Sequence, residues 1–206
     1  GIGQVDILKQ EEVKSLMTKV KPDEIYFLAA VHQSSVDVEV DDGDLFQMSI
    51  DVNVKALVIF LECIRTISPN SKMFYAASSH IFGSPDLSPQ NESTPLKPTC
   101  VYGITKTAGV ETCRYYRENY SVFVNIGIFY NHESPRRASK FVSKKIVEGA
   151  VAIKNDKQKE IILGDLESQI DWGYAPDYML GVHEIMKLSK SDDFVISSGA
   201  KHTIKD

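Results

Sequence analysis

The sequence lacks any apolar run of the length that a membrane-spanning helix needs, about 18–20 residues. It also lacks an opening segment in which positive charges precede an apolar stretch, the pattern of a secretory leader. These two absences predict a soluble, cytoplasmic protein without a membrane partner.

Positive charge is also scarce. Lys and Arg number 23 against 28 Asp and Glu, which gives a formal net charge of −5, and the basic residues form only local patches such as Lys144-Lys145. A nucleic acid is therefore not expected as the principal partner. The three cysteines are odd in number and lack metal-ligand spacing, so we interpret them as reduced thiols and expect no metal site. They are Cys63, Cys100 and Cys113.

No Gly-x-Gly-x-x-Gly or Gly-x-x-Gly-x-x-Gly loop occurs in the sequence, and Gly1-Ile-Gly3 does not supply one. Such a loop normally cradles the pyrophosphate of a dinucleotide at a helix N-terminus. A dinucleotide site would therefore have to be recognised from other residues.

The hydrophobic pattern predicts alternating helices and strands. Helical periodicity over residues 9–20 is followed by a continuous apolar run, Ile25 to Ala30, which is typical of a strand buried on both faces. This alternation predicts an α/β fold with a parallel sheet and right-handed crossovers. The further expected elements are a helix over residues 44–65, a strand over 73–77, a helix over 102–120 and a strand over 122–129.

After Asn131 the pattern changes, and we expect a smaller portion there. It should contain a helix near residues 141–154, a short strand at 161–163 and a helix near 177–188. The expected division is therefore residues 1–131 and 132–206, with the second part interleaved with the last elements of the first.

Tyr102 and Lys106 form a Tyr-x-x-x-Lys pair on the predicted helix. This spacing places both side chains on one helix face, about 5–6 Å apart at Cβ, so the Lys106 ammonium can lower the pKa of the Tyr102 phenol and make it a base toward a hydroxyl. The motif alone is more typical of an exposed tyrosine on a charged helix. Its context, a strand that ends in Ser78-Ser79-His80 and a Pro-rich loop before the helix, favours a redox site.

Ligands of parallel α/β sheets bind at the carboxyl ends of the strands. Three predicted strands have small or polar residues at that end. They are Ala29-Ala30, Ser78-Ser79 and Asn131.

The segment Phe129-Tyr-Asn-His-Glu-Ser-Pro-Arg-Arg137 resembles a signature of the GDP-mannose 4,6-dehydratases, which belong to the extended short-chain dehydrogenase/reductase family. The resemblance covers essentially the whole chain and implies a Rossmann-like, doubly wound parallel sheet. It also explains the missing glycine loop, because the sequence corresponds to the family's fold from about its third strand, and we expect truncation at both ends. Supporting segments are Pro22 to Tyr26, Leu28 to Ala30, Phe141 to Ile146, Leu163 to Leu166 and Asp171 to Gly173.

The resemblance implies an NAD(P)-binding part in residues 1–131, a substrate-binding portion in 132–206, and conversion of GDP-mannose, or of a related GDP-sugar such as a GDP-heptose, to a 4-keto-6-deoxy sugar by internal hydride transfer. Tyr102 would deprotonate the sugar 4-hydroxyl, Ser78 would hydrogen-bond that hydroxyl, and Lys106 would hold the nicotinamide ribose. The implied cofactor is NADP, with NAD possible, and the implied assembly is a homo-oligomer, a dimer or tetramer.

Further site residues follow from the same resemblance. Ala29, Ala30 and Asn53 would lie near the dinucleotide. The implied substrate-binding residues are Ser79, Asn131, Glu133, Arg136 and Lys145, with Arg136 and Lys145 as charge partners of the diphosphate.

Two positions depart from the family pattern. His80 stands where the dehydratases have a glutamate that removes the carbon 5 proton; a neutral histidine could take that proton, or could only pack near the strand end. Ile170 stands where an arginine usually clamps the nucleotide. The alternatives are therefore a GDP-sugar 4-dehydrogenase or 4-epimerase, and a non-catalytic paralogue that binds nucleotide sugar.

Overall fold

A computed structural model describes residues 4–32 and 41–206. The described residues form two compact units. The first contains residues 4–32, 41–129 and 182–195, and the second contains residues 130–181 and 196–206.

A four-stranded sheet is the centre of the first unit, in the order β1 (Glu24–Phe27), β2 (Lys72–Ser78), β3 (Val124–Phe129), β6 (Asp193–Ile196). β1 and β2 are parallel, as are β2 and β3. The expected α/β fold with a parallel sheet is thereby confirmed. Ser78 is paired with Phe129, so the carboxyl ends of β2 and β3 lie at one edge of the sheet.

The first strand is shorter than the apolar run predicts. β1 ends at Phe27, and Ala29 and Ala30 lie beyond it. Directly after the predicted run, the amide of Val31 donates to Oδ1 of Asn53 at 3.0 Å. Asn53 therefore holds the chain just beyond the end of the apolar run.

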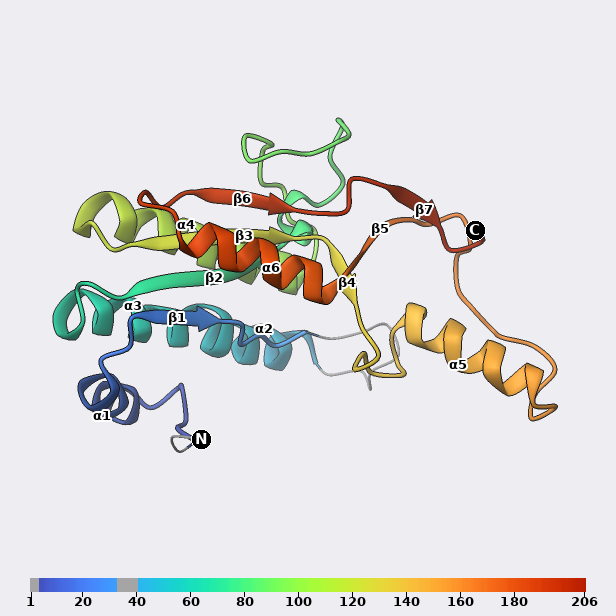
Figure 1. Cartoon of the computed structure of the whole chain (residues 1–206), viewed down its shortest axis with the longest axis horizontal. Helices are drawn as coiled ribbons and strands as arrows, with labels where there is room; N and C mark the ends of the chain where they lie inside the picture. The colour runs from blue at the N-terminus through green and yellow to red at the C-terminus, as the bar shows by residue number, and fades with distance from the viewer. Residues whose placement is uncertain (1–3, 33–40) are drawn as a thin grey trace. The chain divides into compact units, whose positions relative to one another are not determined.

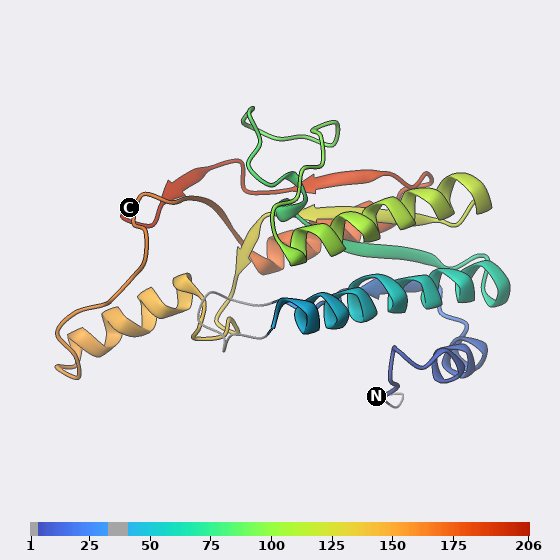
Figure 2. The ribbon, with the colours of Figure 1, turned by 180° about the vertical axis from the view of Figure 1, so that it is seen from behind.

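Helices cover both faces of this sheet (Figures 1 and 2). The C-terminal part of α6 (Ala175–Met186), from Val182 on, lies on one face, where the Ile185 carbonyl accepts a hydrogen bond from Asn125 of β3 at 3.0 Å. On the other face lie α4 (Val101–Tyr120) and a continuous helical segment made of α2 (Asp42–Ile50), the π-helical turn η1 (Asp51–Lys55) and α3 (Ala56–Ile67). α1 (Gln10–Val20) packs against α3.

Apolar residues explain why α3 packs on the sheet. Leu57, Leu61 and Ile64 recur at helical spacing and are completely buried, as are Phe74 and Tyr75 of β2. Burying side chains of this size contributes roughly 1.5–3 kcal/mol each. The long apolar stretch that predicts a helix over residues 44–65 is thus confirmed as helical, with a π-turn at its middle that the sequence did not predict.

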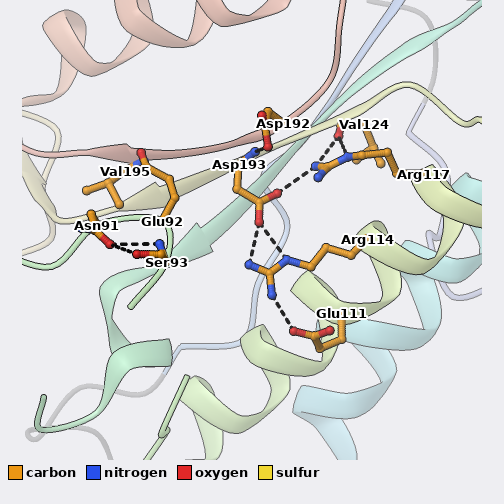
Figure 3. A network of polar contacts seen from close by, with 10 residues as sticks. All are labelled: Asn91, Glu92, Ser93, Glu111, Arg114, Arg117, Val124, Asp192, Asp193 and Val195. Carbon is orange, nitrogen blue, oxygen red and sulfur yellow. Dashed lines mark hydrogen bonds and ion pairs between the residues drawn. The ribbon is translucent and has the colours of Figure 1, made fainter. Parts of the chain in front are cut away.

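An ion-pair network fastens β6 to α4 (Figure 3). Asp193, at the start of β6, accepts from the guanidinium groups of Arg114 at 2.7 Å and Arg117 at 2.9 Å. Arg117 also donates to the carbonyl of Val124 in β3 at 2.8 Å. One carboxylate therefore joins the last strand of the sheet to the helix that carries Tyr102.

The second unit contains a small sheet in the order β4 (Asn131–Glu133), β5 (Gln169–Tyr174), β7 (Lys201–Thr203), and the helix α5 (Val142–Lys154). β4 and β5 are parallel, and β5 and β7 are antiparallel. The strand expected at residues 161–163 is wrong, because this segment is a loop. Ile161 packs closely on α5, since a Cβ at Gly149 would lie 2.6 Å from its Cγ1. The helix therefore covers this apolar side chain, and no strand is needed to bury it.

Within the part of the chain that the structure describes, every helix is too short or too polar to span a bilayer.

Candidate active site

Tyr102 and Lys106 lie one turn apart near the start of α4. The Nζ atom of Lys106 is 5.7 Å from the centre of the Tyr102 ring. The four-residue spacing therefore brings cation and phenol together, as the Tyr-x-x-x-Lys pattern predicts. The tyrosine is half-buried and the lysine is only 1% exposed.

Lys106 is an unusual buried cation. Its Nζ donates to the carbonyl of Ala76 in β2 at 2.7 Å and lies 5.0 Å from the centre of the Tyr75 ring. No carboxylate in the described part of the chain forms an ion pair with it. Desolvation consequently lowers the pKa of Lys106 to about 8. A buried ammonium with donors left for other acceptors fits the hydroxyl groups of a ribose.

Two glycines allow α4 to approach the end of β2. A Cβ on Gly109 would lie 2.0 Å from the Tyr75 hydroxyl, and one on Gly103 would lie 2.6 Å from the carbonyl oxygen of His80. Side chains at these positions would hold the helix away from the strand. The close approach is what brings Lys106 within reach of Ala76.

Ser78 is the last residue of β2 and is 9% exposed. Its Oγ accepts a hydrogen bond from the amide of His80 at 3.3 Å, which starts the short 3₁₀ helix η2 (Ser79–Phe82). Ser79, the first residue of η2, is half-buried. The carboxyl end of β2 therefore leads from Ser78 into η2, which packs against α4.

His80 lies between Tyr102 and Cys100. The centre of its ring is 5.7 Å from that of Tyr102, with the planes at 79°, and its Nδ1 is 3.7 Å from Sγ of Cys100. Desolvation lowers the pKa of His80. The imidazole is therefore neutral around neutral pH, the form that can accept a proton.

A second histidine, His32, belongs to the same cluster, and the sequence did not identify it. The His32 ring lies 4.7 Å from the Tyr102 ring, centre to centre, and 6.3 Å from that of His80. A usable signal was present, because His32 follows the strand that ends before Ala29-Ala30, at the sheet edge where ligands bind. The contact could not be predicted from local patterns, because His32 and Tyr102 are 70 positions apart in the sequence (102 − 32).

Asn53 organises the backbone around this cluster. It is completely buried in the π-turn η1, where Oδ1 accepts from the Val31 amide and Nδ2 donates to Oγ1 of Thr105 at 2.9 Å. π-turns inside helices are frequent at functional sites. Asn53 thus connects the chain after β1 to α4, and its contact with a cofactor stays a prediction, as do those of Ala29 and Ala30.

The remaining predicted site residues belong to the second unit. Glu133 accepts from the Ser143 hydroxyl at 2.7 Å and pairs with Arg137 at 3.2 Å, and the Arg137 guanidinium lies 3.6 Å from the centre of the Phe141 ring. Asn131 pairs with Trp172 in the sheet, and Arg136 and Lys145 are exposed. The roles of Asn131, Glu133, Arg136 and Lys145 toward a substrate stay predictions.

Comparison with solved structures supports the fold. UDP-glucuronic acid 4-epimerase from Bacillus cereus, in complex with UDP-glucuronic acid and NAD, aligns with a TM-score of 0.80 at 22% identity, over 97% of this chain and 60% of that one. RMD from Pseudomonas aeruginosa, complexed with NADPH, aligns with a TM-score of 0.83 at 16% identity, over 99% of this chain and 68% of that one. At these identities the likeness concerns the fold alone.

Comparison of sequences identifies the family. The GDP-mannose 4,6 dehydratase of Drosophila melanogaster is 34% identical over 98% of this chain and 50% of its own length, and the GDP-mannose 4,6-dehydratase of Vibrio cholerae is 31% identical over 97% of this chain and 53% of its own. The chain spans about half the length of the curated relatives it matches. The family model for GDP-mannose 4,6 dehydratase matches residues 2–206, which include the whole Ser78, His80, Tyr102 and Lys106 cluster. The chain therefore belongs to the GDP-mannose 4,6 dehydratase family.

Proposed function

We propose that the complete protein is a cytoplasmic nucleotide-sugar 4,6-dehydratase that acts on GDP-mannose or a related GDP-sugar. The observation that carries this proposal is the position of the Tyr102 ring beside the buried Lys106 and against His80, in a chain that matches the family over residues 2–206. The net reaction removes one water from the sugar and leaves its oxidation level unchanged.

A nicotinamide dinucleotide fits the residues present, and NADP is our expectation, with NAD as the alternative. The buried Lys106 would hold the nicotinamide ribose through its ammonium donors. When bound, the nicotinamide supplies reversible hydride acceptance, from carbon 4 of the sugar and back to carbon 6.

The chain's own residues handle the protons. The Tyr102 phenol oxygen takes the proton of the sugar 4-hydroxyl, while the Ser78 hydroxyl hydrogen-bonds the same oxygen and orients it. Once carbon 4 is a ketone, the carbon 5 proton is acidic, and a ring nitrogen of His80 removes it. The C5–H electron pair forms the C5–C6 double bond as hydroxide leaves carbon 6, takes the proton that His80 has accepted and departs as water. When hydride returns to carbon 6, carbon 5 regains a proton, and this proton balances the one that Tyr102 took from the 4-hydroxyl.

Five residues supply substrate contacts in this proposal. Asn131, Arg136 and Lys145 bind the diphosphate, and Ser79 and Glu133 bind the sugar. Arg136 and Lys145 have the charge and exposure that binding to a diphosphate requires. Because Ile170 cannot pair with phosphate, the nucleotide contact at that position differs from that of the family pattern.

A homo-oligomer, dimer or tetramer, completes the proposal. Large apolar side chains on α2 and α4 are exposed in the single chain, as expected of surfaces that a second copy covers. They are Met48, Ile50, Ile104 and Tyr115.

The test is to incubate the complete protein with cofactor and either GDP-mannose or a GDP-heptose, and to follow product mass and cofactor absorbance. A product lighter by one water, without lasting reduced cofactor, supports the dehydratase. Tyr102→Phe should abolish this product and leave binding of the nucleotide sugar within a few-fold. Unchanged turnover in that variant would remove Tyr102 from the mechanism.

A second candidate, a 4-dehydrogenase or 4-epimerase, is favoured by one observation, the histidine at position 80. Reduced cofactor that accumulates with a product lighter by two hydrogens would establish the dehydrogenase. A product of unchanged mass but altered configuration would establish the epimerase. Binding of either sugar without any product would indicate the non-catalytic paralogue.

A further inference from the structure

The hydroxyl of Thr105 lies in the first turns of α4 and forms hydrogen bonds in two directions. Thr105 is 2% exposed, and its Oγ1 accepts from Nδ2 of Asn53 at 2.9 Å. The same hydroxyl donates to the carbonyls of Val101 and Tyr102, both at 3.1 Å. It therefore joins the helical turn that carries Tyr102 to a side chain from a separate helical segment.

The direction of each hydrogen bond in this chain of contacts follows from the chemistry of its members. The Val31 amide can only donate, so the Asn53 atom that faces it at 3.0 Å is Oδ1. Nδ2 of Asn53 then faces Thr105 and can only donate, which makes Oγ1 the acceptor. The single hydroxyl proton of Thr105 is left for the carbonyl oxygens of α4. The bonds therefore run one way, from Val31 through Asn53 and Thr105 to the turn of Tyr102.

The contact with Asn53 distinguishes Thr105 from other helical threonines. A threonine within a helix often donates to the carbonyl four residues earlier, and Thr18, Thr66 and Thr112 do so near the surface of this molecule. Thr105 is instead buried and also accepts a buried amide group. Loss of its hydroxyl would leave Nδ2 of Asn53 without a partner in the interior.

The hydrogen bonds run parallel to the ring contact between His32 and Tyr102. Val31 precedes His32 directly, and the His32 ring meets the Tyr102 ring with centres 4.7 Å apart and planes at 89°. The backbone beside His32 and the carbonyl of Tyr102 are thus connected through buried side chains, while the rings of His32 and Tyr102 touch. A closed circuit of contacts of this kind restricts how far α4 can move from the chain that follows β1.

We propose that Thr105 is a positioning residue for Tyr102: its hydroxyl sets the spacing between the chain that carries His32 and the first turn of α4, and so holds the phenol against the His32 ring. The spacing stands on the hydrogen bonds alone, whereas its effect on proton transfer rests on the proposed function. Thr105 contacts neither sugar nor cofactor in this proposal and acts only through Tyr102 and His32.

The direct test is the nuclear Overhauser contact between the ring protons of His32 and Tyr102, in complete protein that is deuterated except at histidine and tyrosine. His32→Gln and Tyr102→Leu spectra assign the signals. We expect Thr105→Val, which keeps the shape and removes the hydroxyl, to weaken this contact. Thr105→Ser keeps the hydroxyl and should retain it, as should the control Thr18→Val, which removes a helical hydrogen bond at an exposed position of α1. An undiminished contact in Thr105→Val overturns the proposal.

The wild type gives a reading for which no variant has to fold. The side-chain amide protons of Asn53 should exchange slowly with solvent, because they are buried and bonded to Thr105. Asn119 is the matched reference, since its Nδ2 also donates, to the carbonyl of Tyr115 at 3.0 Å, but at an exposed position. Exchange of the Asn53 amide as fast as that of Asn119 would overturn the proposal.

Turnover of GDP-mannose separates the positioning role from the function. In Thr105→Val we expect kcat to fall about 10–100-fold, the loss that a misplaced reacting group causes, with KM within a few-fold, and Thr105→Ser to restore most of the rate. A wild type that dehydrates GDP-mannose while Thr105→Val keeps full kcat would overturn the positioning role and leave the function standing. A wild type without activity, in which Thr105→Val still weakens the ring contact, would remove the function and support the spacing.

Discussion

The imidazole of His32 meets the phenol ring of Tyr102 edge to face, with ring centres 4.7 Å apart and planes at 89°. His80 approaches the same phenol at 79°. Perpendicular contacts of this kind restrict how the phenol can rotate, and edge-to-face aromatic pairs contribute about 0.5–1.5 kcal/mol beyond buried area. The geometry indicates that two rings from separate elements hold the side chain that is proposed to transfer a proton.

Replacement of His32 by alanine should therefore loosen Tyr102. We expect kcat for sugar turnover to fall by up to about tenfold, the equivalent of one aromatic contact, with KM within a few-fold. His32→Phe keeps the ring contact and should retain most of the rate. If His32→Phe is as slow as His32→Ala, the imidazole nitrogens, and not the ring contact, are what His32 contributes.

The buried ammonium of Lys106 makes stability depend on alkaline pH. Its pKa is about 8 in the folded chain against an ordinary value of 10.5, because burial disfavours the charge. Below pH 8 both the folded and unfolded chains carry the proton, and the folded chain bears the full cost of burying it. Between pH 8 and 10.5 only the folded chain releases the proton, so this contribution to stability rises with pH.

The measurement is urea unfolding of the wild type and of Lys106→Met across that range. We expect the free energy of unfolding of the wild type to rise relative to that of the variant as pH increases. Titratable groups remote from Lys106 titrate alike in both proteins and cancel in the comparison. Parallel curves would mean that Lys106 is not desolvated in the folded chain.

Gly109 is predicted to tolerate no side chain. An alanine Cβ would lie 2.0 Å from the hydroxyl of Tyr75, whose ring is completely buried and cannot move aside easily. We expect Gly109→Ala to lower the free energy of unfolding by about 1–3 kcal/mol, the usual cost of overpacking, and to reduce turnover because α4 carries Lys106. Gly181→Ala in α6 is the matched control, since no atom lies within 4 Å of its Cβ, and it should stabilise the helix by about 0.5–1 kcal/mol. Equal effects of the two variants would contradict the close approach of α4 and β2.

Asp193 should matter more to stability than its neighbours in the network of Figure 3. Its side chain is 8% exposed and is shared by Arg114 and Arg117, which are 28% and 19% exposed. Asp193→Asn should cost about 1.5–3 kcal/mol, the range for hydrogen bonds to charged groups, measured by urea unfolding. Glu111→Gln, which removes a solvent-exposed partner of the same Arg114, should cost less than about 1 kcal/mol. A larger effect at Glu111 would refute the central place of Asp193.

Much of this molecule follows from local patterns in the sequence. The apolar runs predict β2 and β3, and helical periodicity predicts α1, α4 and α5, because buried faces impose a repeat of two or 3.6 residues. The same periodicity places Tyr102 and Lys106 on one face of α4. The sequence did not predict the short strands β4, β6 and β7, because each contains only three or four residues and shows no periodic pattern of its own.

Only the tertiary structure brought together residues that are remote in the sequence. His32, Asn53, His80 and Cys100 come from four separate segments, and their meeting at Tyr102 and α4 depends on the parallel order of β1 and β2 and on the close packing that Gly103 and Gly109 permit. The reason is physical: a periodic pattern reports which side of an element is buried, whereas contacts across strand ends depend on how the elements pack. The sequence by itself therefore determined that Tyr102 and Lys106 share one face of α4, and packing decided which groups surround them.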